Sequence, residues 1–470
     1  MGTLSNALNI ATGALQADQS ALDIVANNVS NANTAGYTRE VPQWQENVPV
    51  NINGTNYGTG VTMTGGSSQR DRVLEQRVQQ QTQTEAASNT RLTALQQVQA
   101  VFSSAATGTA GSPASGISQD LSQFFDSLAQ LEGNPSDNSL RQQVLSTASS
   151  FAAALNSAST QLSEQQASLD QQTGTAVGQV NALTSSIAQL NRQIGSVGAS
   201  GDAGTLEDQR QQDLQQLSQL IGIHTITTED NGLTVTTSAG ALLVSKSSAF
   251  KLSTGTVSGA TNVFDASGNN ITASLAGGGG QLDGMLTVRN QDIPQIQTSL
   301  DTLAYSLATS INTQNAAGSD LSGAAGAGIF SVPGTVAGSA AAINVTMTDP
   351  SKIAAAGSGL GPSDNTNATA MASLANSAIV SGATPVNYYS SFVSSLGSLV
   401  SQVSTENTAQ QASLTQIQGQ RNALSSVDLN EEAASLENLQ RSYEAASKVF
   451  TILDTLMSSA VNLGVQTAVS

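Results

Sequence analysis

Few residues in this 470-residue chain are of the types that carry out acid–base or metal chemistry. His224 is the only histidine, and cysteine is absent, so thiolate metal sites and disulfides are excluded. His224 opens a predicted β segment that has no nucleophile motif near it, which leaves a Ser–His–Asp site with little support. We therefore predict that the protein is not an enzyme and holds neither a cofactor nor a metal.

Three further patterns have simpler explanations than a reactive site. Gly277–Gly280 lacks the following Lys-Ser/Thr of a phosphate loop, so we predict a turn or hinge. Asp230-Asn231-Gly232 lacks the remaining ligands of a calcium loop, so we predict a hairpin turn. Glu431 and Glu432 could form an acid pair or bind a metal, but negative charge at the start of a helix is sufficient to explain them.

The composition excludes several classes of partner. The net charge is −18, which argues against nucleic acid because such binding depends on Lys and Arg contacts to phosphates. Charged residues make up only 10% of the chain, against roughly 25% in ordinary globular proteins. The sequence has no basic segment followed by an apolar run at its start and no apolar stretch of about 18 residues. We expect neither a cleaved signal peptide nor membrane insertion.

The C-terminal segment from Leu429 to about Gly464 predicts the helix on which the remaining elements depend. Its apolar stripe follows steps of three and four: Leu436, Leu439, Tyr443, Ala446, Phe450, Leu453, Met457 and Ala460. Asp428 and Glu431 fit a capping box, and two pairs fit i, i+4 ion pairs: Glu437 with Arg441, and Glu444 with Lys448. More apolar residues lie off the stripe: Val449, Ile452, Leu456, Val461 and Leu463. Such a helix needs a partner helix and further neighbours.

The N-terminal helix is the expected partner. Its apolar residues also follow helical steps: Leu4, Leu8, Ala11, Leu15, Leu22, Val25 and Val29. Asp18 occupies a position where this stripe favours an apolar residue. The helix is expected to end near Ser30, because Asn31, Asn33 and Gly36 follow.

Between these ends the periodicity predicts a mainly α fold with inserted β structure: long terminal and rod-like, coiled-coil-like helices around a middle all-β region. Strands are expected in 41–66, around a hairpin at 225–237, at 242–245, and in a second hairpin formed by 262–264 and 271–275. Gly-rich loops are expected at 107–116 and 195–204. Helices are expected from about 69, at 117–131, 136–194, 206–220, 291–314, 366–377 and 388–424. The predicted domains are 1–40 with 428–470 as paired terminal helices forming an axial core; 41–221 with 285–317 and 366–427 as a helical rod; 222–284 as an inserted β domain; and 318–365 as a small Gly/Ala-rich insertion.

Several stretches resemble a known family. The segment 26–39, Ala-Asn-Asn-Val-Ser-Asn-Ala-Asn-Thr-Ala-Gly-Tyr-Thr-Arg, resembles the N-terminal signature of bacterial flagellar rod, hook and hook-associated proteins. The stretches that narrow the resemblance to hook-associated proteins are 206–210, 278–286, 312–318, 427–433 and 440–445. The resemblance implies a structural subunit at the hook–filament junction. It implies extracellular location, export through the flagellar type III channel without a cleaved signal, and terminal helices that line a tube.

The resemblance also implies the partners: further copies in a ring or helical layer, the hook protein, a second hook-associated junction protein, and an export chaperone on the C-terminal helix. The predicted assembly interface consists of Leu4, Leu8, Leu15, Leu22, Val25, Asn27, Asn28, Asn31, Gly36, Tyr37, Leu436, Leu439, Tyr443, Phe450, Leu453 and Met457. Two alternatives remain at this point. One is a secreted coiled-coil adhesin or effector without an axial role, and the other is an enzyme at the flagellar tip such as a wall hydrolase.

Overall fold

The computed structural model describes residues 2–34, 36–52, 54–103, 116–197, 203–228, 232–257, 259–331 and 333–466. The chain forms two compact units: Met1–Gln83, Gln179–Leu252 and Gln411–Ser470 form unit 1, and Thr84–Gly178 with Ser253–Gln410 form unit 2. Most of the expected loop at 107–116, residues 198–202 of the expected loop at 195–204, and two of the three residues of the expected turn at 230–232 lie outside the described residues. The mainly α class with inserted β structure is confirmed. The four-part domain division remains a prediction.

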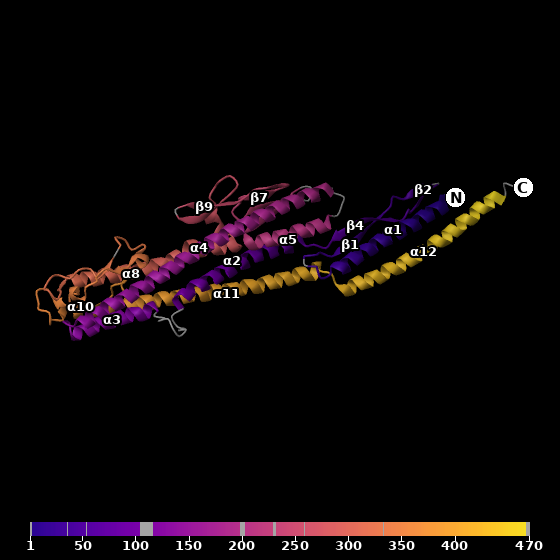
Figure 1. Ribbon diagram of the computed structural model, residues 1–470. Helices are drawn as coiled ribbons and strands as arrows, with labels where there is room; N and C mark the ends of the chain where they lie inside the picture. The colour runs from indigo at the N-terminus through magenta and orange to yellow at the C-terminus, as the bar shows by residue number, and fades with distance from the viewer. Residues whose placement is uncertain are drawn as a thin grey trace. The chain divides into compact units, whose positions relative to one another are not determined.

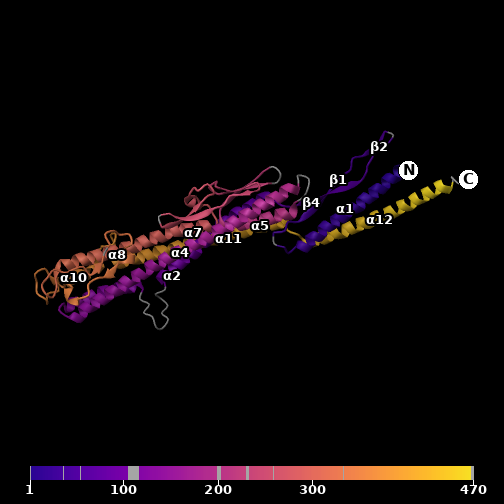
Figure 2. The same cartoon turned by 45° about the horizontal axis from the view of Figure 1, so that its top comes forward.

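Unit 1 contains the two terminal helices, α1 (Gly2–Asn31) and α12 (Leu429–Gln466). They lie side by side with the two chain ends at the same end of the pair (Figures 1 and 2). A hairpin arm runs along α1 on the side away from α12, and its strands are β1 (Glu40–Glu46), β2 (Val50–Ile52), β3 (Thr55–Tyr57) and β4 (Val61–Ser68). Strands in this segment were expected. Glycines allow the arm to approach α1 closely, since Ile10 and Ile24 lie against Gly60 and Gly66.

The remainder of unit 1 combines α5 (Gly204–Leu220), parts of three longer helices and a four-stranded sheet. The sheet order is β5 (Ile223–Thr227), β6 (Leu233–Thr237), β7 (Leu242–Ser245) and β8 (Ser248–Ala249), all antiparallel. The predicted first hairpin and third strand are therefore confirmed. Asn191 attaches the sheet to the long helix, because its Nδ2 donates to Leu233 O at 2.9 Å and to Lys246 O at 2.8 Å.

Unit 2 is built on long helices, as the periodicity predicted. These are α2 (Arg72–Ser103), α3 (Ile117–Gly133), α4 (Asn138–Val197), α8 (Ile293–Ala316), α10 (Thr366–Ser373) and α11 (Pro385–Ser425), of which α2, α4 and α11 also contribute residues to unit 1. The longest helix begins at a side-chain cap, because Asp137 Oδ1 accepts from Ser139 N at 2.7 Å. The seam leucines of α4, namely Leu155, Leu162 and Leu169, are almost completely buried.

The predicted second hairpin is wrong in its boundaries. The pairing strands are β9 (Ser253–Val257) and β10 (Ala260–Phe264), and the segment predicted as its second strand is instead the short helix α6 (Thr272–Leu275). The helix starts there because a side chain satisfies its first backbone N–H, since Asn270 Oδ1 accepts from Thr272 N at 3.0 Å. Thr272 also ties the helix to β10, because its Oγ1 accepts from Val263 N at 2.8 Å. A two-residue period does not reveal such caps.

The helix predicted to begin at 291 begins ten residues earlier. It consists of α7 (Gln281–Thr287), the π-helical segment η3 (Val288–Asp292) and then α8. The predicted turn at Gly277–Gly280 is confirmed, and Asp283 closes it by accepting from Gly277 N at 2.6 Å and Gly279 N at 2.9 Å. Gly284 follows inside α7 because its Cα packs directly against α2, where an added Cβ would lie 2.5 Å from Ala87 O.

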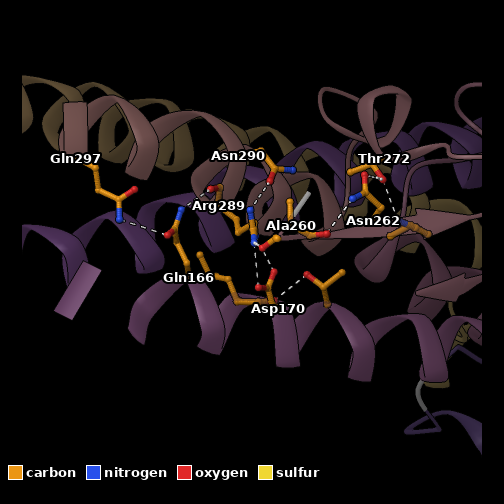
Figure 3. Close-up of polar contacts among 12 residues, drawn as sticks. Gln166, Asp170, Ala260, Asn262, Thr272, Arg289, Asn290 and Gln297 are labelled. Carbon is orange, nitrogen blue, oxygen red and sulfur yellow. Dashed lines mark hydrogen bonds and ion pairs between the residues drawn. The ribbon is translucent and has the colours of Figure 1, made fainter. Parts of the chain in front are cut away.

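Arg289 in the π-helical segment joins the hairpin of unit 2 to α4 (Figure 3). Its guanidinium forms a bidentate pair with Asp170, at 2.7 Å from Nε to Oδ1 and 3.1 Å from Nη2 to Oδ2. Nη2 also donates to Gly259 O at the hairpin turn, at 3.1 Å. The planar guanidinium thus holds three segments together, which a lysine could not do in the same geometry.

The Gly/Ala-rich insertion of unit 2 has little regular structure. Its elements are β11 (Gly318–Ser319), β12 (Phe330–Ser331), α9 (Ser339–Ala342), β13 (Asn344–Val345), η4 (Pro350–Lys352) and β14 (Ala356–Gly357), followed by α10 and η5 (Leu374–Asn376). Asparagine amides of α8 replace the missing strand partners. Asn315 donates to Ala327 O at 2.6 Å and accepts from Ala354 N at 2.9 Å, and Asn312 bonds both backbone groups of Phe330.

Candidate assembly interface

The predicted interface residues on the two paired terminal helices are incompletely covered within the chain. On α1, Val25 is buried, as are Ala11 and Ala21 on the same helix. The remaining predicted apolar residues are half-buried: Leu4, Leu8, Leu15, Leu22, Leu436, Leu439, Phe450, Leu453 and Met457. Tyr443 was predicted to belong to the stripe, but it is 38% exposed.

A second apolar row runs along α12 outside this seam. Val449, Ile452 and Leu456 are 50%, 60% and 51% exposed, and their spacing of three and four residues places them on one side of the helix. We call these three residues the outer ridge. Burying such aliphatic side chains fully is worth roughly 1.5–3 kcal/mol each, so half-exposed ones leave a large part of that stabilisation unused.

The N-terminal signature forms a compact hydrogen-bonded cluster around Asn28, which is 1% exposed. Asn28 Nδ2 donates to Glu40 O at 2.8 Å and to Glu432 Oε2 at 3.1 Å. Its Oδ1 accepts from Tyr37 Oη at 2.8 Å and from Glu40 N at 3.0 Å. Burial raises the pKa of Tyr37, and Glu40, Asp208 and Glu432 raise it further, so the phenol stays protonated and remains a donor.

Arg39 connects this cluster to the start of α12. Its Nε donates to Glu432 Oε1 and its Nη1 to Glu431 Oε2, both at 2.6 Å. Glu432 is 1% exposed. We explained this residue by the favourable negative charge at the start of a helix, but its carboxylate is also the buried partner of an ion pair. The expected capping box is also only half formed. Asp428 Oδ1 accepts from Asn430 N at 2.8 Å, whereas the Glu431 carboxylate bonds Arg39.

A second ion-pair cluster holds the same signature loop against α5. Asp208 accepts from Thr38 N at 3.2 Å and from Arg70 Nη2, and Arg70 Nη1 also donates to Glu207 at 3.3 Å. Burial raises the pKa of Asp208, and Arg70 and Thr38 act against that shift. Gly36, with φ +82°, lies so close to α5 that an added Cβ would be 2.7 Å from Gln212 Nε2.

Three stretches that carry the family resemblance, 26–39, 206–210 and 427–433, therefore meet at one joint. Of the predicted amides, Asn28 is its centre, whereas Asn27 and Asn31 bond each other at 2.8 Å at the end of α1. The sequence prediction missed Arg39, Arg70 and Asp208 and assigned Glu432 a lesser role. Their signal was available: charged residues are scarce in this chain, yet several stand inside or beside the recognised stretches.

Three findings within the described ranges concern metal sites and membrane segments. His224 lies exposed on β5. Within those ranges, no group of three or more His, Cys, Asp or Glu side chains is placed to hold a metal ion. Among the helices that the structure describes, none combines the length and apolarity needed to cross a membrane.

Comparison with known proteins agrees with the sequence stretches that meet at the joint. The family model described as "Flagellar hook-associated protein FlgK helical domain" matches residues 95–330, half of the chain. The chain belongs to this flagellar hook-associated protein family. Models for the flagella basal body rod protein and for the C-terminal part of the basal body rod proteins FlgE, FlgF and FlgG match residues 8–38 and 419–463, which are the two ends.

Individual relatives are similar to this chain over nearly its full length. The flagellar hook-associated protein 1 of Escherichia coli K12 is 26% identical over 98% of this chain and 100% of its own length. The Bacillus subtilis 168 protein of that name is 27% identical over 97% of both chains. The solved structure of the flagellar hook junction protein FlgK from Burkholderia pseudomallei matches with a TM-score of 0.66 at 20% identity. It covers 75% of this chain and 100% of that one, which shows a shared fold.

Proposed function

We propose that this protein is a structural subunit that joins the flagellar hook to the filament and assembles through its terminal helices. The observation that carries the proposal is the outer ridge of Val449, Ile452 and Leu456, which the paired α1 leaves uncovered. A neighbouring subunit in a tubular wall would cover it. Because each copy offers the same ridge, repetition of one head-to-tail contact generates a ring or a helical layer.

The joint around Asn28, Arg39 and Asp208 supports the same role. A wall built from helix pairs transmits force only if each pair is fixed to its own subunit. Two ion-pair clusters, one with Glu432 and one with Asp208, hold the signature loop between α12 and α5. These charges are partly buried and therefore screened less by salt than exposed pairs. The joint thus orients the interface that the helices present.

The family membership supports further proposals about the export of the chain, its neighbours and its chaperone. We infer that it leaves the cell through the flagellar type III channel, with the hook protein and a second hook-associated protein as its neighbours. An export chaperone would hold α12 beforehand, because the half-buried and exposed apolar residues of this helix need cover in the free chain.

A pair of neighbouring substitutions tests the assembly role. Ile452→Asp changes an exposed side chain, so the free chain should keep its helical content and thermal stability. In cells, however, hooks should lose their filaments and swimming should stop, because the carboxylate would be buried between subunits. Leu453→Asp, on the seam, should impair both properties. Ser458→Asp, exposed on another side of α12, is the matched control and should leave swimming intact.

Electron microscopy of flagella gives the decisive readout. A strain lacking the gene should carry hooks without filaments, and the Ile452→Asp strain should resemble it. Filaments that remain attached to hooks in the deletion strain would overturn the junction role in favour of a secreted adhesin or effector.

A further inference from the structure

Asp18 in the middle of α1 is buried, and one of its carboxylate oxygens has no hydrogen-bond partner among the described residues. Asp18 is 8% exposed, and its Oδ2 atom accepts no hydrogen bond from any described residue. It interrupts the apolar row at the helix pair, between Ala11 and Val25 at steps of seven. A buried carboxylate without a hydrogen-bond donor is costly, so a chain that keeps one at an interface position suggests a donor supplied from outside.

The surroundings of Asp18 leave an approach for such a donor. Leu15 and Leu22, three residues before and four after, share its side of the helix and are only half-buried. The seam is therefore incompletely closed beside the carboxylate. A long, flexible side chain from a neighbour could cross these leucines with its alkyl part and place its charged end at Asp18.

One cation of the terminal helices has no ion-pair partner in the part of the chain that the structure describes. Helix α1 contains neither Lys nor Arg, and Arg39 behind it is engaged with Glu431 and Glu432. On α12, Arg441 pairs with Glu437, as predicted. The pair predicted between Glu444 and Lys448 is absent: Lys448 is exposed and has no carboxylate within 4.0 Å among the described residues. Lys448 also adjoins the outer ridge, one residue before Val449 and four before Ile452.

We propose that Lys448 of one copy pairs with Asp18 of the next copy when the outer ridge is covered. The contact would satisfy both unpaired charges in the same event and would set the register of the two helix pairs. The inference rests on the proposed assembly role, because it assigns the partner of the outer ridge as the α1 side of a second copy. Among the described residues of the lone chain, neither Asp18 Oδ2 nor Lys448 has a partner, which favours association over the free state.

Zero-length chemical coupling tests the proposal directly. A carbodiimide activates a carboxylate, a touching amine displaces the leaving group as a urea, and an amide bond remains. Treatment of isolated wild-type flagella should give covalent dimers of this protein whose linked peptides contain Asp18 and Lys448. The map is simple to read because the chain has only three other lysines, Lys246, Lys251 and Lys352.

Matched variants separate the contact from chance proximity. Asp18→Asn and Lys448→Arg should each abolish the coupled dimer, yet Lys448→Arg keeps the positive charge and should keep swimming. Asp23→Asn, which removes an exposed carboxylate on the same helix, should leave the dimer unchanged. As an independent readout, Asp18→Asn, Lys448→Gln and their combination form a double-mutant cycle. Each single change should raise the rate of filament loss under shear about tenfold, and the double variant no further.

The outcomes distinguish this contact from the assembly role itself. Filaments firmly attached to hooks without an Asp18–Lys448 product, or additive effects in the cycle, would overturn the pairing and leave the junction role standing. Filaments attached in the absence of the protein would overturn both.

Discussion

Glu432 at the start of α12 accepts a hydrogen bond from Asn28 at the end of α1, although 404 residues separate the two, with Oε2 and Nδ2 3.1 Å apart. The two terminal helices therefore meet through a buried polar contact as well as through an apolar seam. Apolar rows alone can slide past each other by a turn, whereas a buried hydrogen-bonded charge specifies a single register. The joint thereby fixes which residues of α1 face which residues of α12.

Removal of Arg39 should release this joint. Arg39→Ala leaves the Glu432 carboxylate buried without its cation, and breaking a partly buried pair in this way costs about 3 kcal/mol. Hydrogen exchange should report it as faster exchange in the first turns of α12. Arg441→Ala is the control: its pair with Glu437 is exposed on both sides and should change the free energy of unfolding by less than about 1 kcal/mol. Equal effects of the two variants would refute a structural role for the joint.

Alanine substitutions at two glycines with the same φ angle should distinguish the cost of a left-handed backbone from the cost of a steric clash. Gly36 and Gly54 both have φ +82°, but only Gly36 has a neighbour that a Cβ would meet, at 2.7 Å. Gly54→Ala should cost about 1 kcal/mol from the left-handed conformation alone. Gly36→Ala should cost more, by the energy of displacing Gln212, and should lower the melting temperature further. If the two variants lose the same stability, Gln212 moves aside without cost, and Gly36 is needed only for the left-handed backbone of its turn.

Two helical glycines of unit 2 should respond with opposite sign. An added Cβ at Gly284 would lie 2.5 Å from Ala87 O, so Gly284→Ala should push α7 away from α2 and destabilise unit 2 by about 1–3 kcal/mol. Gly178 has nothing within 4 Å, and Gly178→Ala should stabilise α4 by roughly 0.5–1 kcal/mol, because alanine has the higher helix propensity. Urea unfolding of both variants gives the comparison, and a neutral Gly284→Ala would show that the helices can separate without cost.

Acid should loosen the Gly/Ala-rich insertion of unit 2. Burial alone would raise the pKa of Asp320, but hydrogen bonds from Ser322, Lys352 and Ala324 together hold it well below its usual value. A depressed folded-state pKa stabilises the fold above the unfolded value of about 3.9, and this contribution is lost as the pH falls.

The protection of the Ala324 N–H against hydrogen exchange, relative to the intrinsic rate at each pH, should therefore fall below about pH 4 in the native chain. Asp320→Asn should exchange faster at neutral pH, with a smaller acid response. An unchanged acid response in that variant would assign the effect to another carboxylate. Burial raises the pKa of Asp208, so its contribution to the free energy of unfolding has the opposite pH dependence. The fold loses that stabilisation as the pH rises.

Periodicity was sufficient to predict the long helices and the first hairpin. Rows such as Leu155, Leu162 and Leu169 recur over many turns, so their burial follows from spacing alone. Short elements were predicted less well, because single side-chain caps decide them. Asn270 starts α6 inside a segment that alternates like a strand, and Asp283 closes a glycine turn into a helix ten residues before the expected start.

The joint shows the same limit for the site. The signature identified Asn28 and Tyr37, but the joint also depends on distant segments: Glu432 bonds Asn28 across 404 residues, and Asp208 bonds Thr38 across 170. Ion pairs between distant segments depend on how the helices meet, which no local pattern encodes. Scarcity of charge was the usable signal. In a chain with so few ions, Arg39, Asp208 and Glu432 beside recognised stretches are candidates for specific bonds.

The insertion between α8 and α10 leaves the helical framework and returns to it at one place. Its first and last strands pair directly, Gly318 with Gly357 and Ser319 with Ala356, so the excursion closes on itself. Val336 and Leu360 within it are exposed. An insertion closed by a strand pair in this way is suited to a genetically encoded epitope or fluorophore tag. A tag placed between Gly334 and Gly338 would lengthen the insertion without separating the two paired strands at its base.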